Sequence, residues 1–271
     1  MNRLVVSLLW LIALPLAAQE ASPPQTAPSS TGPIEEIVIT AEKREASLQD
    51  TPIAVSALTS DTIETAQIFS PDRLQWSVPS MTYGQQSSYN FITLRGIGTD
   101  VTVSAESSVA SYEDGVYTGS LLSQQVPSFD LERIEVLRGP QGTLYGRNAD
   151  GGVVNYISKA PRFEPEANAA VSYGKYNAVQ VDAGATGALI DEKLAGRISV
   201  RWGQHDGYRR NIVTGEKEYD LENAAVRGAL LFTPSEDFSL TVRGGYANHE
   251  TSSAYTVLSS NPTGLPGGQI R

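Results

Sequence analysis

The sequence predicts an α+β domain followed by the first antiparallel strands of a transmembrane β-barrel. Three observations support this fold class. Helix and strand signals are mixed between residues 42 and 165, regular apolar–polar alternation takes over after residue 165, and a short apolar leader opens the chain. The 271 residues also include 24 glycines and 12 tyrosines, which is typical of barrel walls and their turns.

The composition excludes several classes of function. A formal net charge of −10, from 20 basic and 30 acidic side chains, argues against nucleic acid as a partner. The absence of cysteine excludes disulfides and thiolate metal sites, and the two histidines, His205 and His249, lack a metal-ligand spacing. No phosphate-binding loop, dinucleotide fingerprint or nucleophile elbow is present. We therefore expect no enzyme activity, no catalytic residue, no cofactor and no metal.

Residues 1–18 predict a cleaved secretory signal. Arg3 supplies a positive start, residues 4–16 form an apolar run, and Ala17 and Ala18 offer a cleavage site. The apolar run is too short for a transmembrane helix, which needs about 20 residues. That length disfavours the alternative of an uncleaved anchor, so we expect the protein to leave the cytoplasm.

A flexible linker and a short strand-forming segment follow the leader. Residues 19–33 are rich in Pro, Ser, Ala and Thr, which predicts an extended and mobile arm. Residues 34–41 then form a good strand, since Ile37, Val38 and Ile39 are β-branched. The residue types alone leave two interpretations open: a segment that pairs with a partner's sheet edge, or the first strand of the next domain.

Residues 42–165 carry the signals of a mixed α/β domain. Asp61 with Glu64 predicts a capped helix, and Ser70–Pro71 predicts a second helix that ends at Pro79. Asp114–Gly115 predicts a tight hairpin turn. Further strands are expected at residues 91–95, 112–117, 134–138 and 153–158.

Four motifs in this region resemble those of a known family. They are Leu-Arg-Gly-Ile-Gly at residues 94–98, Asp-Gly-Val-Tyr at 114–117, the run from Asp130 to Gly146, and Gly-Gly-Val-Val-Asn-Tyr-Ile-Ser-Lys at 151–159. Their order and spacing resemble the plug domain of the TonB-dependent outer-membrane receptors. Residues 34–41 likewise resemble the TonB box of that family, which favours a coupling role for this segment.

The resemblance implies partners, a location and two sets of site residues. A TonB-type inner-membrane energy-transducing protein would pair with the coupling segment, and the receptor would lie in outer-membrane lipid of a Gram-negative cell and take up a scarce ligand such as a ferric siderophore. The expected partner-binding residues are Ile34, Glu35, Glu36, Ile37, Val38, Ile39 and Thr40. The expected plug–barrel coupling residues are Arg95, Gly96, Asp114, Gly115, Glu132, Arg138, Gly139, Pro140, Gly142, Tyr145 and Gly146.

Arginine chemistry explains two of these assignments. Arg95 and Arg138 stand at strand ends beside glycine turns, and a guanidinium forms two parallel bonds to a carboxylate. In the family, similar arginines pair with acidic side chains between plug and barrel. Glu132 and Glu135 are candidate partners within the domain itself.

The last part of the chain predicts membrane-crossing strands. They are expected at residues 167–175, 178–188, 194–203, 222–232 and 238–248, about the length that a tilted strand needs to cross a bilayer. Ile198, Val200 and Trp202 alternate with Arg197, Ser199 and Arg201. A soluble sandwich would also alternate, but two arginines on one face suit a hydrated or plugged lumen better than a dry core.

Five strands do not close a barrel, because plugged outer-membrane transporters use about 22. Residues 166–271 are therefore expected to be the first part of a wall, and the chain a non-transporting fragment of a receptor. Two alternatives remain: a soluble periplasmic plug-like binding module, and a truncated product without function. Candidate ligand loops are residues 83–89 and 99–108.

Overall fold

A computed structural model of the chain describes residues 38–40, 43, 46–49, 51–68, 70–86, 89–99, 106–119, 129–210, 215 and 217–252. The predicted signal and linker, residues 34–37 and most of the 99–108 loop lie outside these residues. Within the described part, no helix is long and apolar enough to cross a membrane.

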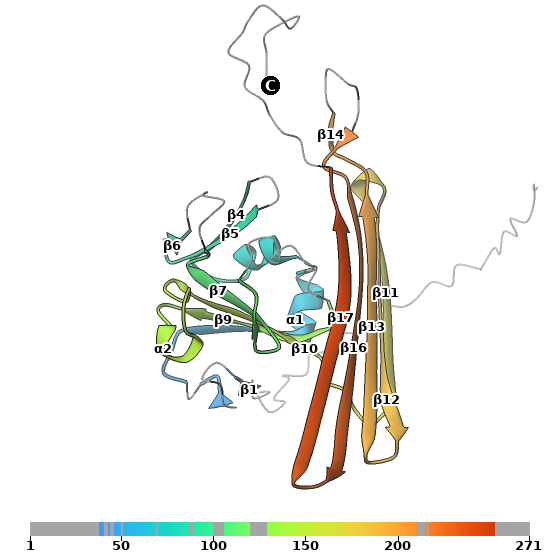
Figure 1. Cartoon of the computed structure of the whole chain (residues 1–271). Coiled ribbons are helices and arrows are strands. Elements are labelled where there is room, and N and C mark those ends of the chain that lie inside the picture. The colour runs from blue at the N-terminus through green and yellow to red at the C-terminus, as the bar shows by residue number, and fades with distance from the viewer. Residues whose placement is uncertain are drawn as a thin grey trace, which may run out of the picture. The chain divides into compact units, whose positions relative to one another are not determined.

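The α+β domain is built on a five-stranded mixed sheet (Figure 1). Its strands, in spatial order, are β3 (Val55–Thr59), β9 (Leu131–Arg138), β10 (Gly152–Ser158), β7 (Val109–Glu113) and β8 (Val116–Tyr117). Only the β10–β7 pair is parallel. Strands β9 and β10 lie inside the sheet, and most of their residues are buried, as expected of strands covered on both faces.

Smaller elements complete the domain. They are β1 (Val38–Ile39) with β2 (Ala46–Ser47), the sheet of β4 (Met81–Gln86), β5 (Tyr89–Leu94) and β6 (Ile97–Gly98), helix α1 (Ser60–Thr65), the 3₁₀ helix η1 (Pro71–Trp76) and the single turn α2 (Gly142–Tyr145). The predicted hairpin turn is present, since Asp114 and Gly115 both have positive φ angles, of 48° and 82°.

The predicted cap of the first helix was wrong by two residues. Thr59, not Asp61, is the N-cap, and its side chain accepts a hydrogen bond from the backbone N–H of Thr62. Asp61 lies in the first turn, where its negative charge favours the helix N-terminus. The second predicted helix is a 3₁₀ helix that begins at Pro71 and ends at Trp76, before Pro79.

Two apolar clusters cover the two faces of the central sheet. One joins α1 and η1 to the sheet through residues such as Ile63, Leu74, Ile134 and Val154. The other lies on the opposite face and contains Ile39, Tyr112, Leu137, Tyr145 and Val153. Ile39, from the predicted coupling segment, is therefore part of the domain's core.

The five predicted membrane strands are present as one antiparallel sheet, the long sheet (Figure 1). It consists of β11 (Glu166–Gly174), β12 (Ala178–Ile190), β13 (Leu194–His205), β16 (Leu221–Ser235) and β17 (Phe238–Glu250). Each strand pairs with the next along the chain. The small hairpin β14 (Arg209–Arg210) and β15 (Lys217–Glu218) extends the β13–β16 connection.

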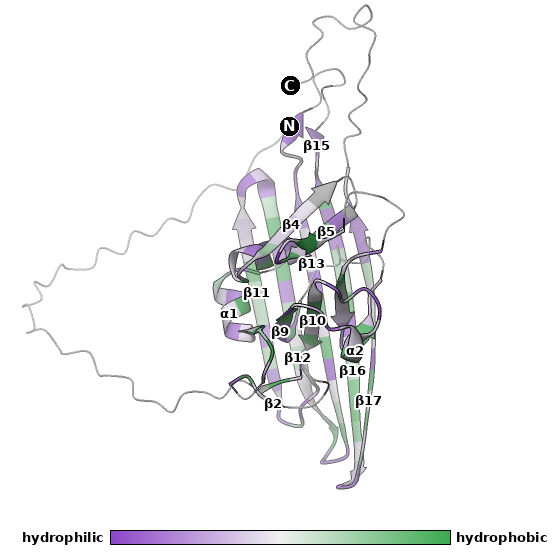
Figure 2. Ribbon diagram, turned by 90° about the vertical axis from the view of Figure 1, so that its left-hand side faces the viewer, coloured by the Kyte–Doolittle hydropathy of each residue, from purple (hydrophilic) through white to green (hydrophobic). Residues whose placement is uncertain are grey.

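Hydrophobic and hydrophilic residues alternate along the strands of the long sheet (Figure 2), and their exposures separate them by face. On β13, Ile198, Val200 and Trp202 are 57%, 42% and 38% exposed, whereas Arg197, Ser199 and Arg201 are 6%, 2% and 5% exposed. On β17, Leu240 and Val242 continue the exposed apolar face. The predicted alternation is confirmed, and the arginines are covered by other parts of the protein.

Glycine substitutions test the packing of the central sheet. A Cβ at Gly152, where φ is +147°, would lie 2.2 Å from the carbonyl oxygen of Leu137 and 2.8 Å from Cδ1 of Leu94. We predict that Gly152→Ala destabilises the domain by more than about 1 kcal/mol, because the backbone conformation and the space both exclude a side chain. Gly142→Ala is the matched control, since a Cβ there meets nothing within 4 Å. Urea midpoints that are equal for the two variants would contradict this account.

Candidate functional site

The edge of the α+β domain that meets the long sheet carries three carboxylates. Glu113 ends β7, Asp114 follows in the hairpin turn, and Asp130 immediately precedes β9. Asp114 and Asp130 adopt positive φ angles of 48° and 54°, so the chain turns sharply at both places. Aspartate tolerates this conformation better than most residues. The turns thereby place acidic side chains where the domain faces the arginines of the long sheet.

The pair Arg197–Asp130 is the most buried ion pair in the described part of the chain. The guanidinium of Arg197 donates from Nε to Oδ2 of Asp130 at 2.6 Å and from Nη2 to Oδ1. The side chains of Arg197 and Asp130 are 4% and 6% exposed. Burial by itself raises the pKa of Asp130, but hydrogen bonds from Arg197 and Ser199 and the charge of Arg197 outweigh it, so the pKa lies below its usual value.

Arg227 makes a second set of contacts beside the first. It donates to Glu113 and, at 2.8 Å, to the backbone carbonyl of Phe129. Its guanidinium also lies 4.9 Å from the centre of the Phe129 ring, and that of Arg201 lies 5.5 Å from the same centre. Phe129 is 4% exposed. Two cations thus contact one buried aromatic ring, an arrangement that contributes cation–π attraction as well as packing.

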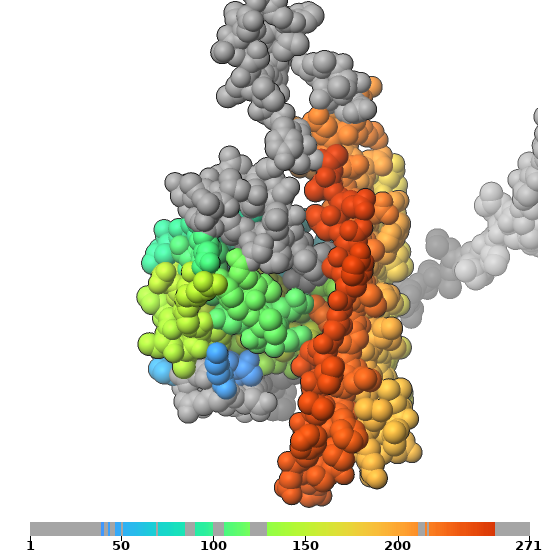
Figure 3. Space-filling model, in the orientation of Figure 1, coloured from blue at the N-terminus to red at the C-terminus, as the bar shows by residue number. Residues whose placement is uncertain are grey.

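Two further arginines complete the inner face of the long sheet. Arg201 pairs within the sheet with Asp182 on β12, which also accepts a hydrogen bond from Gln180. Arg243 on β17 lies 3.7 Å from Asp114, which is itself held by the backbone N–H and hydroxyl of Ser158. The docking contacts therefore extend from β13 across β16 to β17, and Figure 3 shows the α+β domain packed against β17.

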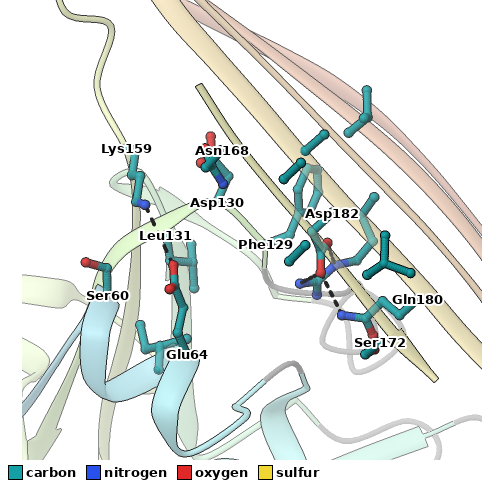
Figure 4. Close-up of a pocket in the computed structure, with 17 residues that line it drawn as sticks. Ser60, Glu64, Phe129, Asp130, Leu131, Lys159, Asn168, Ser172, Gln180 and Asp182 are labelled. Carbon is teal, nitrogen blue, oxygen red and sulfur yellow. Dashed lines mark hydrogen bonds and ion pairs between the residues drawn. The ribbon is translucent and has the colours of Figure 1, made fainter. Parts of the chain in front are cut away.

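A cavity of about 280 Å³ lies beside these contacts, between the domain and strands β11 to β13 (Figure 4). Phe129, Asp130 and Asp182 line one side, and Lys159 lies across from them, 4.0 Å from Glu64 of α1. Glu64 is largely exposed, so this pair contributes little to stability. The domain is thus tightly docked at Asp130 and loosely packed at α1. The described residues contain no cluster of side chains that could hold a metal ion.

The predicted coupling residues fall into three groups. Asp114 lies at the docking interface. Gly96, Gly115, Gly139 and Gly146 have positive φ angles, between 80° and 117°, and shape turns. Pro140 shortly precedes the turn α2, Gly142 is its first residue, and Tyr145 is buried in the domain core, where burial, Glu135 and Tyr112 raise its pKa to about 12.

Arg95 and Arg138 are not paired with Glu132 or Glu135. Both glutamates pair with Arg133, at 2.9 Å and 2.8 Å. Within the described residues neither Arg95 nor Arg138 forms an ion pair, and the buried Nε of Arg138 lacks a hydrogen-bond partner. The suggested pairing inside the domain is therefore wrong, because Arg133 lies on the same face of β9 as Glu135 and closer to Glu132 in sequence.

Sequence reasoning missed most of the docking residues. Asp130 was noted only as the first residue of a motif, and Phe129, Arg227 and Arg243 were not singled out. The sequence did contain a signal for the docking face, because β13, β16 and β17 each carry an arginine at an inward position. Buried arginines require carboxylates, but the sequence does not show which of 30 acidic side chains lies opposite.

The described end of the predicted coupling segment is docked on the domain. Val38 pairs with Ser47 and Ile39 with Ala46. The backbone N–H of Thr40 donates to Glu135 at 2.7 Å. The structure therefore brings Ile39 and Thr40 into contact with the α+β domain, not with the long sheet.

An α+β domain that docks through a buried ion pair on the polar face of an antiparallel sheet, with an apolar face exposed, is the arrangement expected of a domain that plugs the lumen of a β-barrel. Residues 47–153 match the family model described as the TonB-dependent Receptor Plug Domain. Residues 47–153 therefore form a plug domain of this family.

Relatives and solved structures agree with this family. The chain is 34% identical over 161 residues to the ferrioxamine receptor of Yersinia enterocolitica, covering 59% of this chain and 21% of that protein. It is 24% identical over 237 residues to the ferrichrome outer membrane transporter/phage receptor of Escherichia coli, covering 85% and 30%. The chain thus spans less than a third of the length of these relatives.

The fold is also similar to solved receptors. The ferric yersiniabactin uptake receptor FyuA from Yersinia pestis matches with a TM-score of 0.64 at 23% identity, over 68% of this chain and 29% of that one. Pseudomonas aeruginosa FpvA bound to a heterologous pyoverdine matches with a TM-score of 0.69 at 18% identity, over 82% and 29%. At these identities the likeness shows the fold.

Removing one partner of the buried ion pair tests the docking. We predict that Arg197→Ala lowers the free energy of unfolding of the plug by about 3–5 kcal/mol, because the Asp130 carboxylate is then buried without its partner. Arg162→Ala is the control, since its pair with Glu166 is exposed. Pulse proteolysis in urea on the full-length receptor measures both, and equal losses would contradict a docking role for Arg197.

The lowered pKa of Asp130 predicts an acid dependence. The folded state binds fewer protons at this site than the unfolded state, whose pKa is about 3.9. The stabilisation is therefore complete above that value and is lost as the pH falls through the lower folded pKa. Urea midpoints measured from pH 6 to pH 2 should fall more steeply for the parent than for Asp130→Asn. Parallel curves for the two proteins would show that this pair does not contribute.

Proposed function

We propose that the whole protein is a receptor of the Gram-negative outer membrane that takes up a scarce ligand with energy from an inner-membrane partner. The observation that carries this proposal is the docking of a plug domain by buried ion pairs on the polar face of a sheet with an exposed apolar face. A stoppered barrel does not conduct by itself. Transport then requires that the plug be moved by work done from outside the membrane.

The coupling segment is the part of the chain suited to receive that work. Residues 34–40 follow a Pro-rich segment and include several β-branched residues, a composition suited to pairing with the edge of a partner's sheet. The partner is proposed to be a TonB-type energy-transducing protein. Force applied there acts directly on Ile39, which is part of the plug core. Local unfolding of a plug is less costly than unfolding of the barrel wall.

The ligand is proposed to be a ferric siderophore. The chain is similar to the ferrioxamine receptor of Yersinia enterocolitica and to the ferrichrome outer membrane transporter of Escherichia coli, and ferrioxamine and ferrichrome are siderophores. Export through a cleaved signal at residues 1–18 is part of the same proposal.

The coupling role is tested by deletion in the full-length protein. We predict that removal of residues 34–41 abolishes accumulation of a radiolabelled ferric siderophore while surface binding of the siderophore is retained, because only the connection to the energy source is lost. An equally long deletion of linker residues 22–29 is the matched control and should leave uptake in place. Unchanged uptake after removal of residues 34–41 would refute the coupling role.

A further inference from the structure

Two cavities follow one another along the inner face of the long sheet. The first is the cavity of about 280 Å³ beside α1, which we call the α1 cavity. The second, the outer cavity, measures about 260 Å³ and is lined by Gln67 of the plug and by the ends of β11, β12, β13 and β16. Ser172 and Gln180 line both cavities. In Figure 4 these two residues lie at one end of the α1 cavity and Lys159 with Glu64 at the other, so the two cavities form one file that leads to α1.

The outer cavity faces the outside of the cell in the proposed receptor. At one end of the long sheet the turns are short, at residues 191–193 and 236–237, whereas residues 206–220 form a long connection at the other end. Outer-membrane barrels have short periplasmic turns and longer external loops. The outer cavity lies at the end with the long connection, since His205 at the end of β13 and Leu221 at the start of β16 line it. A ligand that arrives from outside therefore meets the outer cavity before the α1 cavity.

The outer cavity offers hydrogen-bonding groups to a ligand. The described residues that line it include amides and hydroxyls but no carboxylate, lysine or arginine. Asn223 is 8% exposed, and its Oδ1 lacks a hydrogen-bond partner in the part of the chain that the structure describes. Gly203 lies beside it, and a Cβ there would be 3.1 Å from that oxygen, so the glycine leaves room at the amide. Because buried polar groups normally have partners, this lining fits a ligand that carries amide and hydroxyl groups.

The plug is held to the long sheet away from this file of cavities. Its docking carboxylates pair with arginines of β13, β16 and β17. Strand β11, in contrast, is exposed along its whole length, including the inner-face residues Asn168 and Ser172. Helix α1 lies across the cavity from it, and its Glu64 is largely exposed and lies 4.0 Å from Lys159. The α1 side of the plug therefore moves away from the wall at a lower cost than the docked edge, where a buried ion pair has to break.

The volumes of the two cavities explain why α1 has to move. Pockets that hold small ligands usually measure about 300–1,000 Å³. Neither the α1 cavity, at about 280 Å³, nor the outer cavity, at about 260 Å³, reaches that range while α1 is in place. Ser60, Ile63 and Glu64 of α1 line the α1 cavity, so a displacement of this helix enlarges it. Such a displacement does not require the Arg197–Asp130 pair to break.

We propose that the ligand passes the plug on this side, from the outer cavity into the α1 cavity and along the inner face of β11 and β12. Asn223 and Ser172 contact the ligand in passage, after it has bound outside, and α1 is the element of the plug that moves aside. The docked edge at Asp130 stays in place. This inference rests on the proposed function, since it gives the route of the ligand that the receptor takes up.

Closing the route after folding tests the proposal. Ser172→Cys in a cysteine-free full-length receptor places a thiol where the two cavities meet. A bulky water-soluble maleimide then fills the passage, so we expect uptake to fall to the level of the variant that lacks residues 34–41, with surface binding retained. The probe is radiolabelled ferrioxamine or ferrichrome, whichever the parent accumulates. Arg210→Cys, exposed on β14 at the same end of the sheet, is the labelling control and should keep its uptake.

A second pair of cysteines tests the movement of α1 itself. Ile63→Cys on α1 and Ile134→Cys on β9 belong to the same buried apolar cluster. In cells that transport the probe, we expect the reaction of Ile63→Cys with a small maleimide to be about tenfold or more faster than in cells treated with a protonophore, because α1 opens locally. Ile134→Cys is the matched control and should stay unreactive in both conditions, since β9 remains docked through Asp130.

These measurements separate the route from the coupling role. If labelled Ser172→Cys transports like the parent, or loses surface binding together with uptake, the route beside α1 is refuted. It is also refuted if Ile63→Cys and Ile134→Cys become reactive together, or if neither does while uptake proceeds. All of these results are compatible with a deletion of residues 34–41 that abolishes uptake. If uptake survives that deletion, the proposed function fails instead, whatever the labelling shows.

Discussion

The contact between the plug and the long sheet depends on the pairing of buried arginines with carboxylates. Arg197 and Arg227 lie on the polar face of the long sheet, opposite Asp130 and Glu113. The Arg197–Asp130 pair is buried on both sides, whereas Glu113 is 41% exposed. Desolvated ion pairs contribute less to stability than their Coulomb energy suggests, but breaking one is costly. They therefore fix where the plug sits more than they strengthen its fold.

A second buried charge in the plug also depends on partners from a distant part of the chain. Glu135 is buried and is satisfied in part by Thr40, at the described end of the coupling segment. Both sets of polar contacts involve β9, since Asp130 immediately precedes this strand and Glu135 lies in its middle. Strand β9 thus links the wall to the segment, while the α1 side is bounded by a cavity and an exposed pair. The plug is firmly held at one edge and loosely held at another.

The sequence predicted the parts of this structure that local patterns determine. Alternation in β13 placed Ile198 and Arg197 on opposite faces correctly, and Asp114–Gly115 predicted the hairpin because few residue pairs tolerate two positive φ angles. Contacts between distant residues were not predictable. The pairing of Arg197 with Asp130 joins residues 67 apart, and that of Thr40 with Glu135 joins residues 95 apart. Glu132 and Glu135, which were suggested as partners of Arg95 and Arg138, pair instead with Arg133, because Arg133 is close to both along β9.

The central claim is that the long sheet turns one face to hydrocarbon and the other to the plug. Nitroxide labels at successive positions from 195 to 203 of the full-length receptor in lipid vesicles test it most directly. We predict that even-numbered positions collide readily with oxygen and poorly with a water-soluble nickel chelate, whereas odd-numbered positions are immobile and shielded from both. Access of the nickel chelate to positions 198, 200 and 202 would contradict the claim.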